Sequence, residues 1–402
     1  MVTIKQLYKI GPGPSSSHTM GPKNAVEYIL NRYPSADYVK MTFFGSLACT
    51  GKGHLSDYIA DKTFGDIKHD IVFDYVTHKR HPNTMTFEIH QGDKTYKETV
   101  ISIGGGFIKV NGEKKLEAKE VYPFKSFKDI KKYCLENNLS LIDFIVKFED
   151  KDIYEYAEII YKQMMETISK GLLNEGVLPG KLMVKRKAKD IFDGIEKKDS
   201  DTEAQRKRIF AYAFAVAEEN ASGGNVVTAP TCGSAGVLPA LVKHAEDEGI
   251  SHKKILDGIL VAGLIGVLVK QNASISGAEA GCQAEIGTAS SMGAAFLCEV
   301  ENLGIDKIER ASEIAMEHSL GMTCDPIGGY VQIPCIERCA MGAMRSLESY
   351  TLCKLLDNTS SKISLDTVVS TMYKTGKDLR CKYKETSKGG LAKTYFEGEF
   401  NY

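Results

Sequence analysis

The chain has 402 residues, enough for two domains or for one large core with an appendage. Its 51 basic and 52 acidic side chains nearly cancel, so no basic excess points to nucleic acid or an anionic membrane as a partner. The first residues lack the apolar core of a signal peptide, and the longest uncharged apolar run, 258–269, is too short to span a bilayer. Ten cysteines without a secretory signal are typical of a reducing compartment, so we expect a cytoplasmic protein.

Residues 11–22 form a loop rich in Gly, Pro and Ser that leads into a helix predicted over 22–33. The hydroxyl side chains suited to capping this helix are Ser15, Ser16, Ser17 and Thr19. Hydroxyls and free backbone N–H groups at a helix entrance can bind a carboxylate or a phosphate. Plain helix capping explains the same residues, so the pattern alone leaves both interpretations open.

The next segments alternate between strand patterns and one short helix. Strands are predicted over 37–44, 70–76, 84–89 and 95–103. A turn and a short helix are predicted between the first two strands, from 50 to 61. The glycines at 104–106 are not a dinucleotide fingerprint, because no helix with the required spacing follows them. We expect residues 1–112 to form a small α+β domain.

Residues 113–126 are charged, contain a proline and are predicted to be a linker. Beyond them, apolar residues recur every three or four positions. Helices are predicted over 127–137, 139–147, 152–171, 202–220, 235–247, 251–270, 285–302, 307–318, 335–356 and 364–383. We therefore expect 127–402 to be one larger all-α domain, giving a multidomain α+β protein.

Three cysteines, Cys282, Cys324 and Cys335, lie beside Gly and Pro rather than inside apolar runs. Thiolates near chain breaks and helix ends can point at one shared metal or iron–sulfur cluster. Their spacing follows no short zinc or ferredoxin pattern, so spacing alone leaves ordinary buried thiols as the alternative.

Seven segments resemble the bacterial L-serine dehydratases that depend on an iron–sulfur cluster rather than on pyridoxal phosphate. In chain order they are 13–19 (GPSSSHT), 50–54 (TGKGH), 228–231 (TAPT), 274–287 (SISGAEAGCQAEIG), 317–329 (EHSLGMTCDPIGG), 333–338 (IPCIER) and 382–391 (KYKETSKGGL). They occur in the order found in that family and extend from about residue 5 to about 392.

The resemblance implies a lyase of amino-acid degradation and gluconeogenesis, with fused beta-chain-like and alpha-chain-like domains and a homodimeric assembly. It implies a [4Fe–4S] cluster on Cys282, Cys324 and Cys335, with one iron free to take the hydroxyl of L-serine as a Lewis acid.

An imidazole can accept the α-proton at working pH, so His54 is the first candidate for the base and His18 the second. The substrate carboxylate is expected to meet the four hydroxyl residues of the Ser-rich loop, with Lys52 as a possible charge partner.

The sequence also departs from the family. Many single-chain members end with a cysteine that can fill the fourth iron position, whereas this sequence ends Phe400-Asn401-Tyr402. Cys232 and Cys339 stand where asparagine is expected, either as neutral changes or as part of an altered pocket. Related β-eliminations on L-cysteine or L-threonine, and a non-catalytic amino-acid-binding role, are therefore the alternative functions.

Overall fold

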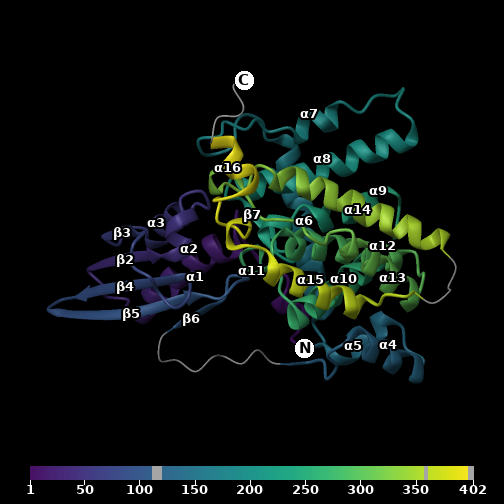
Figure 1. Cartoon of the computed structure of the whole chain (residues 1–402), viewed down its shortest axis with the longest axis horizontal. Coiled ribbons are helices and arrows are strands. Elements are labelled where there is room, and N and C mark those ends of the chain that lie inside the picture. The colour runs from purple at the N-terminus through teal and green to yellow at the C-terminus, as the bar shows by residue number, and fades with distance from the viewer. Residues whose placement is uncertain (111–119, 357–360, 397–402) are drawn as a thin grey trace.

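The computed structural model describes residues 1–110, 120–356 and 361–396. Figure 1 shows a small part with a twisted sheet beside a larger part built almost entirely of helices. This arrangement confirms the predicted fold class, a small N-terminal α+β part followed by a larger helical part. The predicted boundary at 112/113 lies within 111–119, outside the described residues, so that boundary stays a prediction.

The small part is a five-stranded sheet in the order β3-β2-β4-β5-β6. Its strands are β2 (Tyr38–Phe44), β3 (His69–Asp74), β4 (Thr84–Gln91), β5 (Lys94–Ser102) and β6 (Ile108–Val110). The pair β2/β3 is parallel and the other pairs are antiparallel. Every second residue of β2, namely Val39, Met41 and Phe43, is fully buried, as the period-two side-chain alternation of a strand requires.

Three helices complete this part: α1 (Gly21–Arg32), α2 (Gly45–Thr50) and α3 (Ser56–Phe64). Ala25, Val26 and Ile29 of α1 share one apolar core with the buried face of β2. The turn between α2 and α3 carries His54 and lies at the end of β2, where the sheet approaches the helical part.

The helical part packs around α10 (His252–Asn272) and α12 (Thr288–Val300). Its other helices are α4 (Phe127–Glu136), α5 (Leu141–Phe148), α6 (Ile153–Leu173), α7 (Ala188–Asp193), α8 (Asp201–Ala221), α9 (Val237–Asp247), α11 (Gly277–Ala280), α13 (Ile305–Glu317), α14 (Cys335–Leu355), α15 (Leu365–Asp378) and α16 (Gly390–Phe396). Among the described residues, α10 is the helix long and apolar enough to cross a membrane, but 78% of that window is buried inside the protein.

The first residues of the chain belong to the core of the helical part, which the sequence analysis did not anticipate. Met1, Ile4, Leu7 and Tyr8 are buried among its helices. The following strand, β1 (Ile10–Pro12), pairs antiparallel with β7 (Asn225–Val227), so the region predicted to be all-α contains a strand. This pairing anchors the Ser-rich loop directly to the helical part.

Two predicted helices differ from the observed ones near the cavity described below. The helix predicted from 285 starts as a π-helical turn, Gln283–Gly287, before α12. The helix predicted over 364–383 ends at Asp378, because the chain continues through a 3₁₀ turn, Cys381–Tyr383, to a bridge between Lys384 and Cys324. The short helix α7 was not predicted.

Candidate active site

A cavity between the two parts is lined by residues from segments far apart in the sequence. All three predicted cysteine ligands line it, together with His54 and the serines of the loop before α1. The lining residues used below are Ser15, Ser16, Ser17, His54, Thr231, Cys232, Gly277, Cys282, Glu285, Cys324, Cys335, Arg338 and Glu385. The cavity has an empty volume of about 710 Å³, including the space open to solvent.

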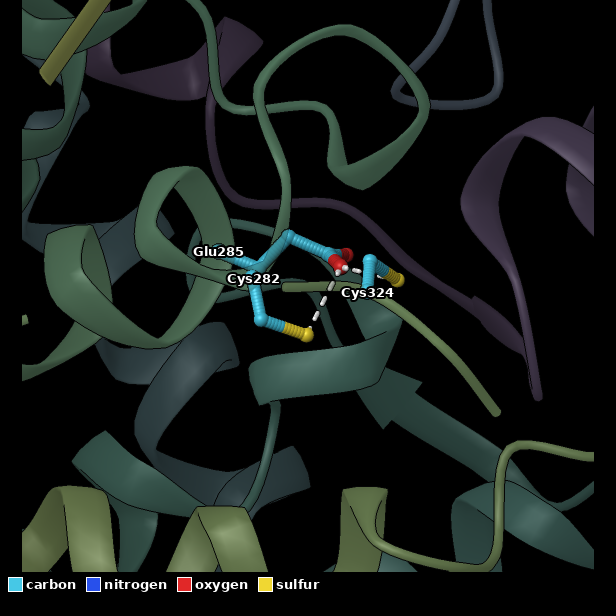
Figure 2. A group of neighbouring side chains, drawn as sticks. All are labelled: Cys282, Glu285 and Cys324. Atoms are coloured by element: carbon cyan, nitrogen blue, oxygen red, sulfur yellow. Dashed lines mark hydrogen bonds between the residues drawn. The ribbon is translucent and has the colours of Figure 1, made fainter. Parts of the chain in front are cut away.

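Two of the cysteines surround a half-buried carboxyl group, that of Glu285 (Figure 2). The Sγ atoms of Cys282 and Cys324 and a carboxylate oxygen of Glu285 all lie within 4.8 Å of one another. The Cys282 thiol lies 3.9 Å from Glu285 Oε2, and the Cys324 thiol lies 4.0 Å from the same oxygen. Cys335 faces the same cavity from the start of α14. The structure thus brings the three predicted sulfurs to one cavity.

Each cysteine lies at an interruption of regular structure. Cys282 follows Gly281, whose φ of +78° ends α11 and favours glycine, and it precedes the π-helical turn. Cys324 lies on an extended stretch that pairs with the segment at Lys384. Cys335 is the first residue of α14, directly after Pro334. These breaks let side chains from three segments converge, as the Gly and Pro neighbours predicted.

The half-buried cation Arg338 lies beside the sulfurs, and of the three thiols only Cys282 has a lowered pKa. A hydrogen bond from the Cys324 thiol lowers the pKa of Cys282, and the Arg338 guanidinium acts in the same direction despite burial. Burial acts to lower the pKa of Arg338, but the neighbouring sulfurs of Cys282 and Cys335 raise it overall. Arg338 is itself fixed by Nη1 donating to the carbonyl of Thr323 at 2.7 Å.

Glu285 lies at the centre of this group, beside two thiols and the hydroxyl of Thr231. Burial, followed by the charge of Cys282, raises the pKa of its carboxyl group well above the usual range. The hydroxyl of Thr231 donates a hydrogen bond of 2.7 Å to Glu285 Oε1. A Cβ atom at Gly277 would lie 2.5 Å from Glu285 Oε2 and 3.1 Å from Cys324 Sγ, so a side chain here would displace the Glu285 carboxyl group.

His54 reaches the cavity from the α+β part. Its Nδ1 lies 2.9 Å from the carbonyl oxygen of Thr50, which can only accept, so Nδ1 carries a proton. Nε2 is buried, has no hydrogen-bond partner among the residues that the structure describes, and lies 3.6 Å from the Glu385 carboxylate. Burial opposes ionisation of Glu385, but the two histidines and the Ala278 backbone N–H lower the pKa of this carboxyl group overall.

His18 lies behind His54, with 4.7 Å between the ring centroids. Its Nδ1 lies 2.8 Å from Ser17 Oγ and its Nε2 lies 2.9 Å from Ser46 Oγ, so both ring nitrogens are engaged. Burial, followed by the charge of His54, lowers the pKa of His18 to about 4. His18 is not among the cavity-lining residues, and this geometry suits a positioning role.

Two other predicted site residues also lie outside the cavity lining. Thr19 donates a 2.7 Å hydrogen bond to the carbonyl of His54, and therefore supports the histidine rather than facing the cavity. Lys52 is exposed, with its Nζ 5.4 Å from the ring centroid of Phe73. Among the residues that the structure describes, Arg338 rather than Lys52 is the Lys or Arg side chain that lines the cavity.

Sequence reasoning missed the roles of Glu285, Arg338 and Glu385, although all three lie within the motifs quoted above. Glu285 is three residues after Cys282 and Arg338 is three residues after Cys335, so helical spacing could have placed both beside a ligand. Glu385 reaches the cavity because the backbone N–H of Glu385 donates to the carbonyl of Cys324 at 2.7 Å. The pairing of Glu385 with Cys324 joins residues far apart in the sequence, so no local sequence pattern predicts it.

Comparison with known proteins gives two matches to family models. Residues 3–60 match the serine dehydratase beta chain, and residues 74–392 match the serine dehydratase alpha chain. The chain belongs to the serine dehydratase family. Both chains of the family are therefore fused here in one polypeptide.

Curated relatives agree with this assignment over nearly the whole chain. The chain is 40% identical to an L-serine dehydratase of Helicobacter pylori, with 98% of each chain covered. It is 36% identical to an L-serine dehydratase of Haemophilus influenzae, covering 98% of this chain and 99% of that one. It is 37% identical to L-serine dehydratase 2 of Escherichia coli, with 98% of each chain covered.

Proposed function

We propose that this enzyme is an L-serine dehydratase, an ammonia-lyase that converts L-serine to pyruvate and ammonia with the help of a [4Fe–4S] cluster. The observation that carries the proposal is one cavity that joins three cysteines of the helical part to His54 and the Ser-rich loop of the other part. Family membership and the L-serine dehydratase relatives support the same reaction.

The residues present fit such a cluster. Cys282, Cys324 and Cys335 supply three soft sulfur ligands, and Arg338 offsets the negative charge that thiolates bring into a buried site. Gly277 leaves room beside Cys324 Sγ that a larger residue would fill. When bound, the cluster supplies a Lewis acid for the departing hydroxyl of serine.

The Ser-rich loop supplies donors for the substrate carboxylate. Ser15 Oγ accepts from the backbone N–H of His18, and Ser17 Oγ is bound to the His18 ring. Ser16 also lines the cavity, and its hydroxyl has no partner among the described residues, so it is the free donor of the three. Hydroxyl and backbone donors at a helix entrance suit a carboxylate.

His54 removes the α-proton. Because Nδ1 donates to Thr50, the neutral ring presents the lone pair of Nε2 toward the cavity. The imidazolium formed on proton transfer is stabilised by the Glu385 carboxylate, 3.6 Å from Nε2. Loss of the α-proton and the β-hydroxyl gives 2-aminoacrylate, which tautomerises to an imine and hydrolyses in water to pyruvate and ammonia.

The proposed partner is a small amino-acid substrate, with neither nucleic acid nor a membrane. We further propose a cytoplasmic homodimer. The near-neutral composition supports a partner other than nucleic acid or a membrane, and so does the burial of the single long apolar helix of the described residues. The homodimer rests on the family resemblance alone.

The test is purification without air, followed by iron and sulfide counting and by rate measurements on L-serine, L-threonine and L-cysteine. We expect a brown protein that forms pyruvate fastest from L-serine and loses activity on oxidation. A colourless, fully active protein would overturn the cluster, and a higher kcat/KM on L-cysteine would overturn the substrate.

A further inference from the structure

A second cavity lies on the other side of the glycine-rich turn at Gly104–Gly106. It has an empty volume of about 820 Å³, including the space open to solvent, and Gly105 lines both cavities. Its wall combines β1, the start of α1, Phe107 and Asn225 from β7, so both parts of the molecule contribute. None of its described lining residues is acidic, whereas Lys9 and Lys23 are basic.

Two ammonium groups meet at Phe107. Lys9 Nζ lies 5.1 Å and Lys270 Nζ 5.4 Å from the centroid of the Phe107 ring. Across residues 1–110, 120–356 and 361–396, neither ammonium group lies within salt-bridge distance of a carboxylate. Lys270 Nζ donates to the backbone carbonyl of Gln6 at 3.0 Å, and Lys9 Nζ has no hydrogen-bond acceptor there. By contrast, Lys23 is paired with Glu27.

This arrangement is electrostatically incomplete. Burial, followed by the charge of Lys9, lowers the pKa of Lys270 to about 8, and burial lowers the pKa of Lys9. Two half-buried cations that share one ring and lack a counter-charge repel each other. An anion bound to Lys9 in the cavity would reduce that repulsion and gain a charge-assisted hydrogen bond from Lys9. Asn24 and Asn225 add amide groups on the same wall.

We propose that this second cavity binds a small oxyanion, a phosphate or carboxylate group, at Lys9. Lys270 is not among the residues that line the cavity, and it contributes through its charge beside the Phe107 ring. The site is distinct from the catalytic cavity but touches the same loop. Met20 lines the second cavity and is the last residue of the π-helical turn Ser16–Met20. The same turn is held from the sheet by Ser102, whose Oγ donates a hydrogen bond of 2.8 Å to the carbonyl of Ser17. An occupant would therefore contact the back of the loop proposed to hold the serine carboxylate.

The test is calorimetric titration of the anaerobic enzyme with inorganic phosphate and, separately, with acetate, at constant ionic strength set with chloride. We expect the wild-type enzyme to bind the anion saturably. Lys9→Met and Lys270→Met should each bind it at least tenfold more weakly. Lys94→Met, at an exposed position on β5, is the matched control and should bind like wild type. Tighter binding of phosphate assigns a phosphate group, and tighter binding of acetate assigns a carboxylate.

Several outcomes would overturn the proposal. One is that neither phosphate nor acetate binds saturably in the chloride buffer. Another is that Lys9→Met binds the anion with an affinity within twofold of wild type. Lys9 decides the matter if Lys270→Met fails to fold, because Lys9 lies outside the helical core. An anion-dependent KM for L-serine, present in wild type and absent in Lys9→Met, is the expected kinetic effect. Only this kinetic measurement depends on the proposed function, because the calorimetric titration with anions does not require the enzyme to turn over L-serine.

Discussion

The two parts of the molecule bring different chemistry to one cavity. The helical part contributes soft or charge-bearing groups: three thiols, the half-buried Glu285 and the Arg338 guanidinium. The α+β part contributes hydrogen-bonding and proton-accepting groups: the serine hydroxyls and the Nε2 atom of His54. Substitutions of the three cavity-lining thiols should therefore affect metal content, whereas substitutions of the α+β groups should affect turnover or substrate binding at unchanged metal content.

The largest effect is expected for Cys282→Ser. Loss of one of three sulfur ligands should lower iron content sharply and reduce kcat by about 10³-fold or more, because the Lewis acid is lost. Iron counting and the visible spectrum of the anaerobic protein measure this. Cys298→Ala is the matched control, since Cys298 is equally buried but lies near Cys353 and the Lys307 carbonyl, not at the cavity. Equal iron loss in both variants would contradict the assignment.

The His54→Asn variant should retain the iron content of wild type but have a much lower kcat. Removal of the base is expected to lower kcat by about 10²- to 10⁴-fold while KM changes little. Steady-state kinetics on protein of matched iron content measures the split. A variant that turns over at the wild-type rate would assign the base elsewhere and end the proposed division between the two parts.

Glu385→Gln tests the contact at which the parts meet. The amide keeps the shape but not the charge that stabilises a protonated imidazole, so kcat should fall by about 10- to 100-fold. Iron content should remain that of wild type. The control is Glu337→Gln, an exposed residue whose only described ion pair, 3.8 Å with Lys187, lies at the surface.

Ser16→Ala should act mainly on binding. Loss of one hydroxyl donor to a carboxylate is expected to raise KM for L-serine by about tenfold, with kcat changed much less. An effect confined to kcat would instead place Ser16 at the reacting atoms and require a different orientation of the substrate.

The smallest effect concerns stability rather than rate. Because burial depresses the pKa of His18 to about 4, the unfolded chain binds the extra proton below its own value of about 6.5. The stabilising contribution is therefore complete above about pH 6.5 and is lost as the pH falls toward 4. Urea unfolding at pH 7 and 4.5 should show wild type losing roughly 2 kcal/mol more than His18→Asn. Equal losses would mean that His18 is not buried in its neutral form.

Local patterns predicted most of the architecture but not the completion of the cavity. The β2 alternation and the helical periodicity of the larger part predicted their elements well, since both depend on residues close in sequence. The Gly and Pro neighbours of the three cysteines correctly predicted chain breaks. Glu385 could not be predicted in this way, because its position depends on pairing with Cys324 and on a φ of +55° at Glu385 itself. The packing of Met1–Tyr8 into the helical core likewise depends on contacts with distant helices.

The pairing of Cys324 with the stretch around Lys384 has a consequence for biosynthesis. Backbone bonds from Cys324 to Tyr383, and from Glu385 back to Cys324, link a predicted ligand to residues translated some sixty positions later. A nascent chain still lacking that stretch cannot set the cysteine in place or present Glu385 to His54. Chains in which this stretch has not yet been translated are therefore expected to lack the arrangement proposed to hold the cluster.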